Sequence, residues 1–247
     1  MTIRPISGLG RVVQILIVGA SALALLVYGW LYAQLRDGTY VLHVPDPNGR
    51  PGTAYWTGTS LPAGALGLLY LPGAVMLAAE IVWLFWQHRA TENLWARGYG
   101  GLRIRPGLAV GWWFVPIASL FMPCIAMLEL DRRSTPDGLP RHASPVVGIW
   151  WAAWIAYSLL PTIGLFVAAL RPFTDLFEGV DERTTSFDLS PVAHAVAPWL
   201  LVTALWLLVT GALAIAVVRR IGAAQDAMLA SPSGWLVPVP ARPDAIA

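Results

Sequence analysis

Long uncharged stretches dominate the pattern of apolar and polar positions along this chain. About 20 consecutive apolar residues form a helix long enough to cross the hydrocarbon core of a bilayer. Five stretches reach that length, and four of them predict ordinary spans, near residues 12–35, 62–86, 147–170 and 192–218. Trp and Tyr side chains gather near their ends, as in the aromatic belts of membrane proteins. The pattern therefore predicts an all-α integral membrane protein.

The fifth apolar stretch, here called the broken segment (residues 108–130), carries Pro116 and Pro123 seven residues apart. Proline removes a backbone donor and disrupts a helix, and in lipid every backbone polar group needs a partner inside the protein. We therefore expect four transmembrane helices plus a Pro-broken hairpin that is re-entrant or interfacial. The alternative is five full spans, since prolines do occur in spanning helices.

The arginines favour four spans over five. All sixteen basic residues are arginines, and with five spans eight of them fall on each side of the membrane. If the broken segment turns back, twelve fall on one side and only Arg36, Arg50, Arg171 and Arg183 on the other. Inner-membrane proteins keep their excess of positive charge in the cytoplasm. The sequence thus predicts a multi-pass protein of a bacterial cytoplasmic (inner) membrane with both termini cytoplasmic.

The composition agrees with a membrane protein and narrows the chemistry. The chain is 57% hydrophobic and 12% charged, whereas soluble domains carry about 25% charged residues. A net charge of +2 gives no reason to expect nucleic acid as a partner. The single cysteine, Cys124, excludes an internal disulfide and Cys-pair metal motifs. We expect one polytopic domain over residues 1–230 and a disordered Pro-rich tail over 231–247.

The two connections on the predicted outer side differ in character. Residues 39–44 and 53–57 are β-prone and flank a run of turn formers, so a small hairpin is plausible there. Residues 171–190 are acidic and are expected to be solvated, without the ligand spacing of a metal loop. His194, near the start of the last span, reads as a hydrogen-bonded interface histidine more readily than as a proton relay.

The second span continues past the predicted membrane boundary as a polar helix. Arg89, Asn93 and Arg97 follow one another at i, i+4 and i+8 and so share one face. They could bind an anionic headgroup, or they could clamp the backbone carbonyls freed by the prolines of the broken segment. Snorkelling arginines that anchor the helix at the interface are the simpler structural interpretation. Gly98 suits the end of this helix.

Glu80 lies inside the second span and is the candidate intramembrane titratable group. A carboxylate at membrane depth is costly and by default suggests a functional site. It could take up protons, pair with an arginine, or bond a neighbouring helix. At the end of the broken segment, Glu129 and Asp131 precede Arg132 and Arg133, where local salt bridges are expected.

Residues 85–134 carry a motif that resembles a known family. The motif comprises Trp86, Arg89, Asn93, Pro106-Gly107, Gly111, Trp113-Phe114, Pro116, Pro123 and Arg133-Ser134, with a later pair at Trp150-Trp151. It resembles a bacterial membrane-protein family, mainly actinobacterial, known as domain of unknown function 4328, over roughly residues 64–218. Where that family often has Asn, this chain has Ser119. The resemblance implies a multi-pass membrane protein and supplies no catalytic residue.

The sequence points to a non-enzymatic accessory or scaffold protein. It contains no zinc-protease, phosphate-loop, nucleophile-elbow or Cys-x-x-Cys motif, and its four histidines are scattered. We therefore expect no catalytic residue, no cofactor and no metal. The expected partners are the lipid bilayer and either anionic lipid headgroups or a protein. The alternative is a small transporter or channel-like protein that uses the broken segment and Glu80.

Overall fold

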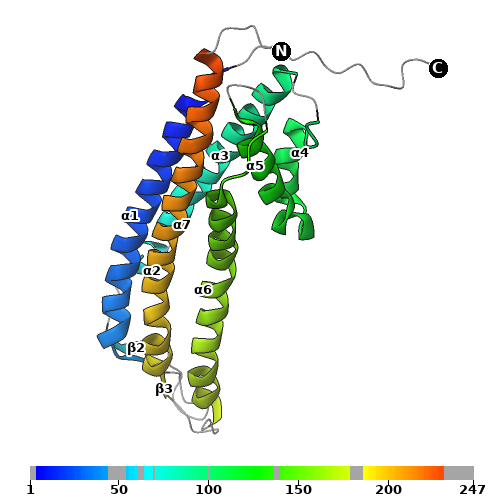
Figure 1. Ribbon diagram of the computed structural model, residues 1–247. Helices are drawn as coiled ribbons and strands as arrows, with labels where there is room; N and C mark the ends of the chain where they lie inside the picture. Colours follow the sequence, from blue (N-terminus) through cyan, green and yellow to red (C-terminus); the bar gives the residue numbers. More distant parts are fainter. Residues whose placement is uncertain are drawn as a thin grey trace, which may run out of the picture. The chain divides into compact units, whose positions relative to one another are not determined.

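Four long helices account for most of the protein. The computed structural model describes residues 4–43, 54–59, 64–68, 70–98, 101–135, 140–178 and 186–230. Within these residues four helices are long and apolar enough to cross a membrane: α1 (Ser7–Asp37), α3 (Tyr70–Ala96), α6 (Pro145–Glu178) and α7 (Ser190–Ala230) (Figure 1). The predicted class, an all-α membrane protein with four spans, is confirmed.

The observed helices extend beyond the predicted spans. α1 begins at Ser7 rather than at 12, and α7 continues to Ala230 rather than ending near 218. Hydropathy detects only the apolar part of a helix, whereas helical structure continues into its polar ends. In the second predicted span, the described helical residues are α2 (Ala65–Leu68) and α3 from Tyr70 onward, and Leu69 between them lies outside the described residues. The tail predicted over 231–247 lies outside the described residues.

The chain divides into two compact units, and each long helix contributes to both of them. Unit 1 comprises residues 1–17, 77–152 and 212–247, and unit 2 comprises residues 18–76 and 153–211. The units are described separately below. Unit 1 contains the broken segment and twelve of the sixteen arginines.

A small sheet in unit 2 joins two connections of the chain. The predicted hairpin is present as β1 (Tyr40–His43) paired antiparallel with β2 (Tyr55–Gly58). A third strand, β3 (Ser186–Asp188), pairs antiparallel with the other edge of β1, giving the order β2-β1-β3. This third strand was not predicted, because residues 171–190 read as a solvated acidic loop. The connection between α1 and α3 and the connection between α6 and α7 therefore meet in one sheet.

The helices of unit 2 pack through small side chains. Ala24 of α1 and Ala204 and Leu207 of α7 form a buried cluster. On α6, a Cβ added at Gly164 would overlap the ring of Trp199 on α7, so glycine is required for this approach. In a membrane the hydrophobic effect does not drive helices together, because lipid is as apolar as their side chains. Helices there associate by close packing at small residues. Nε2 of His194 lies 2.9 Å from the carbonyl oxygen of Gly38. This contact agrees with the predicted hydrogen-bonded interface histidine.

The broken segment of unit 1 is not a continuous helix. It consists of α4 (Pro106–Gly111), the 3-10 turns η1 (Trp112–Phe114) and η2 (Ile117–Leu120), and α5 (Met122–Arg133). The interruptions fall at Val115-Pro116 and at Phe121, next to the two prolines that predicted them. The boundaries predicted at 108 and 130 are within three residues of those observed. α4 packs against α5, so the two parts of the segment form a hairpin.

Candidate functional site at the broken hairpin

The hairpin has two arms: α4 with the residues just before it, and α5. Hydrogen bonds join the arms at the end away from the tip, and this end (residues 103–105 and 129–132) is here called the root. The Glu129 carboxylate on α5 accepts hydrogen bonds from the backbone N–H groups of Arg103, at 2.7 Å, and Ile104, at 3.2 Å. The Trp95 indole donates to the Ile104 carbonyl at 3.0 Å. Glu129 thus fixes the start of one arm against the end of the other. The expected local salt bridge of Glu129 is replaced by these backbone contacts.

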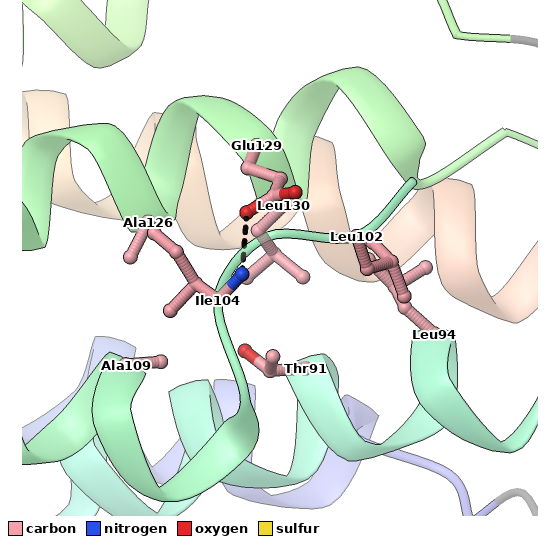
Figure 2. A pocket seen from close by; sticks show the side chains of 8 residues that line it. All are labelled: Thr91, Leu94, Leu102, Ile104, Ala109, Ala126, Glu129 and Leu130. Atoms are coloured by element: carbon pink, nitrogen blue, oxygen red, sulfur yellow. Dashed lines mark hydrogen bonds between the residues drawn. The ribbon is translucent and has the colours of Figure 1, made fainter. Parts of the chain in front are cut away.

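Small residues between the arms leave only a minor cavity. Ile104, Ala109 and Ala126 form a buried cluster in which the short alanine side chains let α4 approach α5. The cavity beside it is lined by α3 and both arms, namely by Thr91, Leu94, Leu102, Ile104, Ala109, Ala126, Glu129 and Leu130 (Figure 2). Its free interior, about 10 Å³, is no more than a single water molecule needs.

Gln87 of α3 ties the hairpin to the second span. Its amide nitrogen donates to the Ala109 carbonyl at 3.2 Å, and its amide oxygen accepts from the Trp113 indole at 3.0 Å. The Gln87 side chain is fully buried. Sequence reasoning missed this residue, although an uncharged amide at the end of an apolar span was a signal. The clamp hypothesis expected Arg89 and Asn93 to hold the broken segment; Gln87 holds it instead, at the Ala109 carbonyl and the Trp113 indole and not at a carbonyl freed by Pro116 or Pro123.

Asn93 holds the two chain ends of unit 1 instead of the hairpin. Its amide accepts from the backbone N–H of Arg4 at 3.0 Å and donates to the Arg4 carbonyl at 2.8 Å. It also donates to the amide oxygen of Gln225 on α7 at 3.0 Å. Gln225 in turn donates to the Ala90 carbonyl, at 2.9 Å, and to the Ser134 hydroxyl, at 3.2 Å. The clamp hypothesis is therefore wrong for Asn93.

Arg89 is half-buried, and within the described residues it forms no hydrogen bond or ion pair. The clamp hypothesis is therefore wrong for this residue as well. Arg89 and Asn93 lie on the same face of α3, but among the described residues only the Asn93 amide forms hydrogen bonds, to Arg4 and Gln225. Arg97, the third residue of the predicted face, is also half-buried. α3 ends at Ala96, and Gly98 follows with φ +71°, as its predicted role at the helix end requires.

Asp131 is the most highly connected side chain at the end of α5. It is fully buried, and its Oδ1 lies 2.8 Å from Nε of Arg220 and 3.1 Å from Nη2 of Arg141. Its Oδ2 accepts from the backbone N–H of Ser144 at 2.7 Å. The ion pairs therefore reach the next connection and α7 instead of the neighbouring Arg132 and Arg133. The carboxylate thus links α5 to the connection that follows it and to α7, whose Arg220 is 89 residues away.

Five tryptophans form a continuous aromatic cluster inside unit 1. Successive ring centroids lie 4.9 to 5.7 Å apart in the order Trp86, Trp83, Trp150, Trp151 and Trp113. Trp151 also donates from its indole to the Leu120 carbonyl at 3.1 Å, next to a break in the hairpin. The indole N–H groups of Trp83 and Trp86 are buried without an acceptor among the described residues. The motif residue Trp86 is thus a packing residue of this cluster.

The remaining motif residues shape the tip of the hairpin. Gly111 has ordinary helical φ, and nothing lies within 4 Å of a Cβ placed there. Phe114 and Pro116 are exposed, and the Ser119 hydroxyl donates weakly to the Pro116 carbonyl at 3.4 Å. Pro123 is buried in the first turn of α5, where a missing N–H costs no helical hydrogen bond.

Arg133 lies beside the turn that precedes the hairpin. A Cβ added at Gly101 would come within 3.3 Å of Nη2 of Arg133, and Gly101 has φ +78°. Glycine at this position therefore permits both the turn and the approach of the guanidinium.

Glu80 is exposed on α3 and is not among the residues that line the small cavity. Ser119 is likewise absent from that lining. Within the described residues no group of three or more His, Cys, Asp or Glu side chains could hold a metal ion. Neither candidate transport residue therefore lines this cavity.

The fold and the site define a class of protein: an α-helical membrane protein in which a Pro-broken hairpin is held by buried polar side chains. The chain belongs to the family described as domain of unknown function (DUF4328), whose model matches residues 52–223. The family resemblance inferred from the motif is confirmed, and the match extends further on both sides than expected. No curated protein and no solved structure matches the chain.

Proposed function

We propose that this protein is a non-enzymatic accessory or scaffold protein of a bacterial cytoplasmic membrane. One observation carries the proposal: four buried polar side chains of unit 1, namely Gln87, Asn93, Asp131 and Gln225, each join separate segments of the chain. Their backbone and side-chain partners come from α3, α4, η1, α7 and the residues between the helices. Polar groups used in this way rigidify a site instead of serving a reaction.

The proposed orientation rests on charge. Twelve of the sixteen arginines belong to unit 1, and the other four belong to unit 2. An excess of arginine near the ends of spans marks the cytoplasmic side. We place the chain ends and the hairpin root in the cytoplasm and the small sheet outside.

Sided thiol labelling tests this orientation. In a Cys124→Ser background, His142→Cys marks the connection between α5 and α6, and Tyr55→Cys marks β2. A membrane-impermeant maleimide applied to intact spheroplasts is expected to label the Tyr55 position only, with His142→Cys reacting after lysis. Labelling of His142→Cys in intact cells contradicts the re-entrant hairpin and indicates five spans.

The scaffold role predicts a protein contact on the cytoplasmic extension of α7. Leu229 is 38% exposed there, although it is apolar. A photo-cross-linking amino acid at Leu229 is expected to give one discrete protein adduct. The matched control is Leu26 on α1, which is 72% exposed within a span and should meet lipid. Equal adducts at both positions, or none at Leu229, contradict the scaffold role.

A transporter or channel-like function is the second candidate, and the exposure of Glu80 on a spanning helix favours it. Reconstituted protein would then carry protons or ions across vesicle membranes, and Glu80→Gln would abolish the flux. Asp226→Asn serves as the comparison, because it removes an exposed carboxylate from the part of α7 beyond the predicted span. Absence of flux above that of empty vesicles removes this candidate.

A further inference from the structure

Three exposed arginines lie on the two chain segments that meet at the root of the hairpin. Arg103 and Arg105 precede α4, and Arg132 lies in the last turn of α5. All three are exposed. The Glu129 contacts to the backbone of Arg103 and Ile104 bring these two chain segments together. The three arginines therefore lie at one end of the hairpin, although Arg103 and Arg132 are 29 residues apart in the sequence.

The nearby carboxylates are already engaged elsewhere. Glu129 is occupied by two backbone N–H groups, and Asp131 is buried among Arg141, Arg220 and Ser144. Within the described residues, none of the three root guanidinium groups has a carboxylate within 4.0 Å. The Glu129 carboxylate offsets at most one of the three positive charges, so the root keeps an excess of positive charge.

The surface that leads away from this root is apolar. No charged residue occurs from Pro106 to Leu128, and Phe114, Ile117 and Phe121 are 72%, 79% and 60% exposed. α5 has 12 residues and is therefore about 18 Å long. That length is close to one leaflet, since the full hydrocarbon core is about 30 Å thick. The hairpin can bury its tip in lipid while its root stays at headgroup level.

We propose that the hairpin root binds the phosphate groups of anionic phospholipids through Arg103, Arg105 and Arg132. The ligand chemistry is a phosphodiester, and the source is the leaflet that the hairpin enters, because the cations stand at the base of an exposed apolar surface. A guanidinium matches a phosphate with paired hydrogen bonds. This inference rests on the re-entrant orientation proposed above and not on the scaffold role.

Native mass spectrometry of the full chain tests the proposal. Delipidated protein in mild detergent is titrated with phosphatidylglycerol and, separately, with phosphatidylcholine. The triple variant R103Q/R105Q/R132Q is expected to lose at least about tenfold in apparent affinity for phosphatidylglycerol. The matched control is R11Q/R36Q/R219Q, which removes the same charge from exposed arginines away from the root. Equal affinities in the two triple variants overturn the inference.

Two further measurements distinguish binding of a lipid from binding of a free anion, and a lost binding site from a misfolded protein. Inorganic phosphate should not displace phosphatidylglycerol, and displacement would mean a soluble-anion site instead of a lipid site. Ile117→Asp keeps the arginines but places a charge on the apolar tip, so it should also weaken phosphatidylglycerol binding. Unchanged binding by Ile117→Asp contradicts a leaflet-inserted site. Tryptophan emission compared between variants reports whether the Trp cluster stays folded.

The outcomes are distinguishable from those of the proposed function. A root that shows no preference for phosphatidylglycerol overturns the lipid site and leaves the cross-linking at Leu229 unaffected. External labelling of His142→Cys removes the re-entrant hairpin and the lipid site together.

Discussion

Units 1 and 2 bury polar side chains of different kinds. In the described part of unit 1 these include the amides and carboxylate Gln87, Asn93, Asp131 and Gln225. In the described part of unit 2 they are only the hydroxyls Ser21, Ser190 and Thr210. An amide or carboxylate has several hydrogen-bonding sites and can hold three segments at once, whereas one hydroxyl usually serves a single backbone group.

The difference follows the backbone. Unit 1 contains the broken segment and the ends of several helices, whose carbonyl and N–H groups have no intrahelical partner. Gln87 and Glu129 supply partners there. Among the described residues of unit 2 no such interrupted segment occurs, and its helices pack closely at small residues such as Gly164. Buried amide and carboxylate side chains thus accompany the broken segment.

The strongest test of this contrast removes the Asp131 carboxylate. Asp131→Ala leaves Arg141, Arg220 and the Ser144 N–H without their shared acceptor. The free energy of unfolding should fall by about 3 kcal/mol, at the lower end for a broken buried pair because both guanidiniums are partly exposed. Unfolding in mixed micelles with a rising fraction of SDS measures this change.

The control for Asp131 is the exposed ion pair of unit 2. Asp37 and Arg36 lie 3.3 Å apart with side chains 74% and 63% exposed. Asp37→Ala should cost less than about 1 kcal/mol, because exposed pairs contribute little. Comparable losses for Asp37→Ala and Asp131→Ala would mean that the buried network does not distinguish unit 1.

Packing in unit 2 is tested at Gly164. Gly164→Ala places a methyl group in the ring of Trp199, so α6 and α7 must separate or the ring must rotate. We expect a loss of about 2 kcal/mol in the same unfolding measurement. Gly148→Ala on the same helix has nothing within 4 Å of the new Cβ and should be neutral or slightly stabilising. A neutral Gly164→Ala contradicts the close approach.

A smaller effect is expected at the contact between α3 and the hairpin. Gln87→Leu removes the amide that donates to Ala109 and accepts from Trp113, which should cost about 1–2 kcal/mol. Amide hydrogen exchange should rise in α4 and η1 and stay unchanged in β1. Gln14→Leu loses only an exposed contact with Arg219 and serves as the control. Unchanged exchange in α4 would show that Gln87 does not hold the hairpin.

The sequence predicts the features that neighbouring residues determine, but it does not predict contacts between residues that are far apart in the chain. The four spans, the interrupted segment and the hairpin of β1 and β2 follow from hydropathy, from Pro116 and Pro123, and from β propensity over a few residues. The partners of Asn93 do not, because Arg4 and Gln225 are 89 and 132 residues away. The sequence identified Arg89 and Asn93 as a shared helix face, but periodicity cannot tell which helix covers that face.

In unit 2, strand β3 likewise depends on a contact that is distant in the sequence. β3 joins a sheet through backbone pairing with β1, although its own sequence, within an acidic loop, favours solvent. Asp188 ends this strand and accepts from the backbone N–H of Ser190 at 2.9 Å, at the start of α7. The Ser190 hydroxyl accepts from the Tyr40 N–H at 2.9 Å and so connects the sheet to the helix. These contacts require the fold of unit 2 to exist first.

The smallest expected effect is a pH dependence at this junction in unit 2. Hydrogen bonds from the side chain and backbone of Ser190 lower the pKa of Asp188 below its ordinary value of 3.8. A lowered pKa means that the ionised carboxylate stabilises the folded state above pH 3.8, and that this contribution is lost as the pH falls through the lower folded value. Ser190→Ala should raise the Asp188 pKa back toward 3.8, as followed by the NMR shift of its carboxyl carbon. An unchanged Asp188 titration in Ser190→Ala would show that the Ser190 hydroxyl does not lower its pKa.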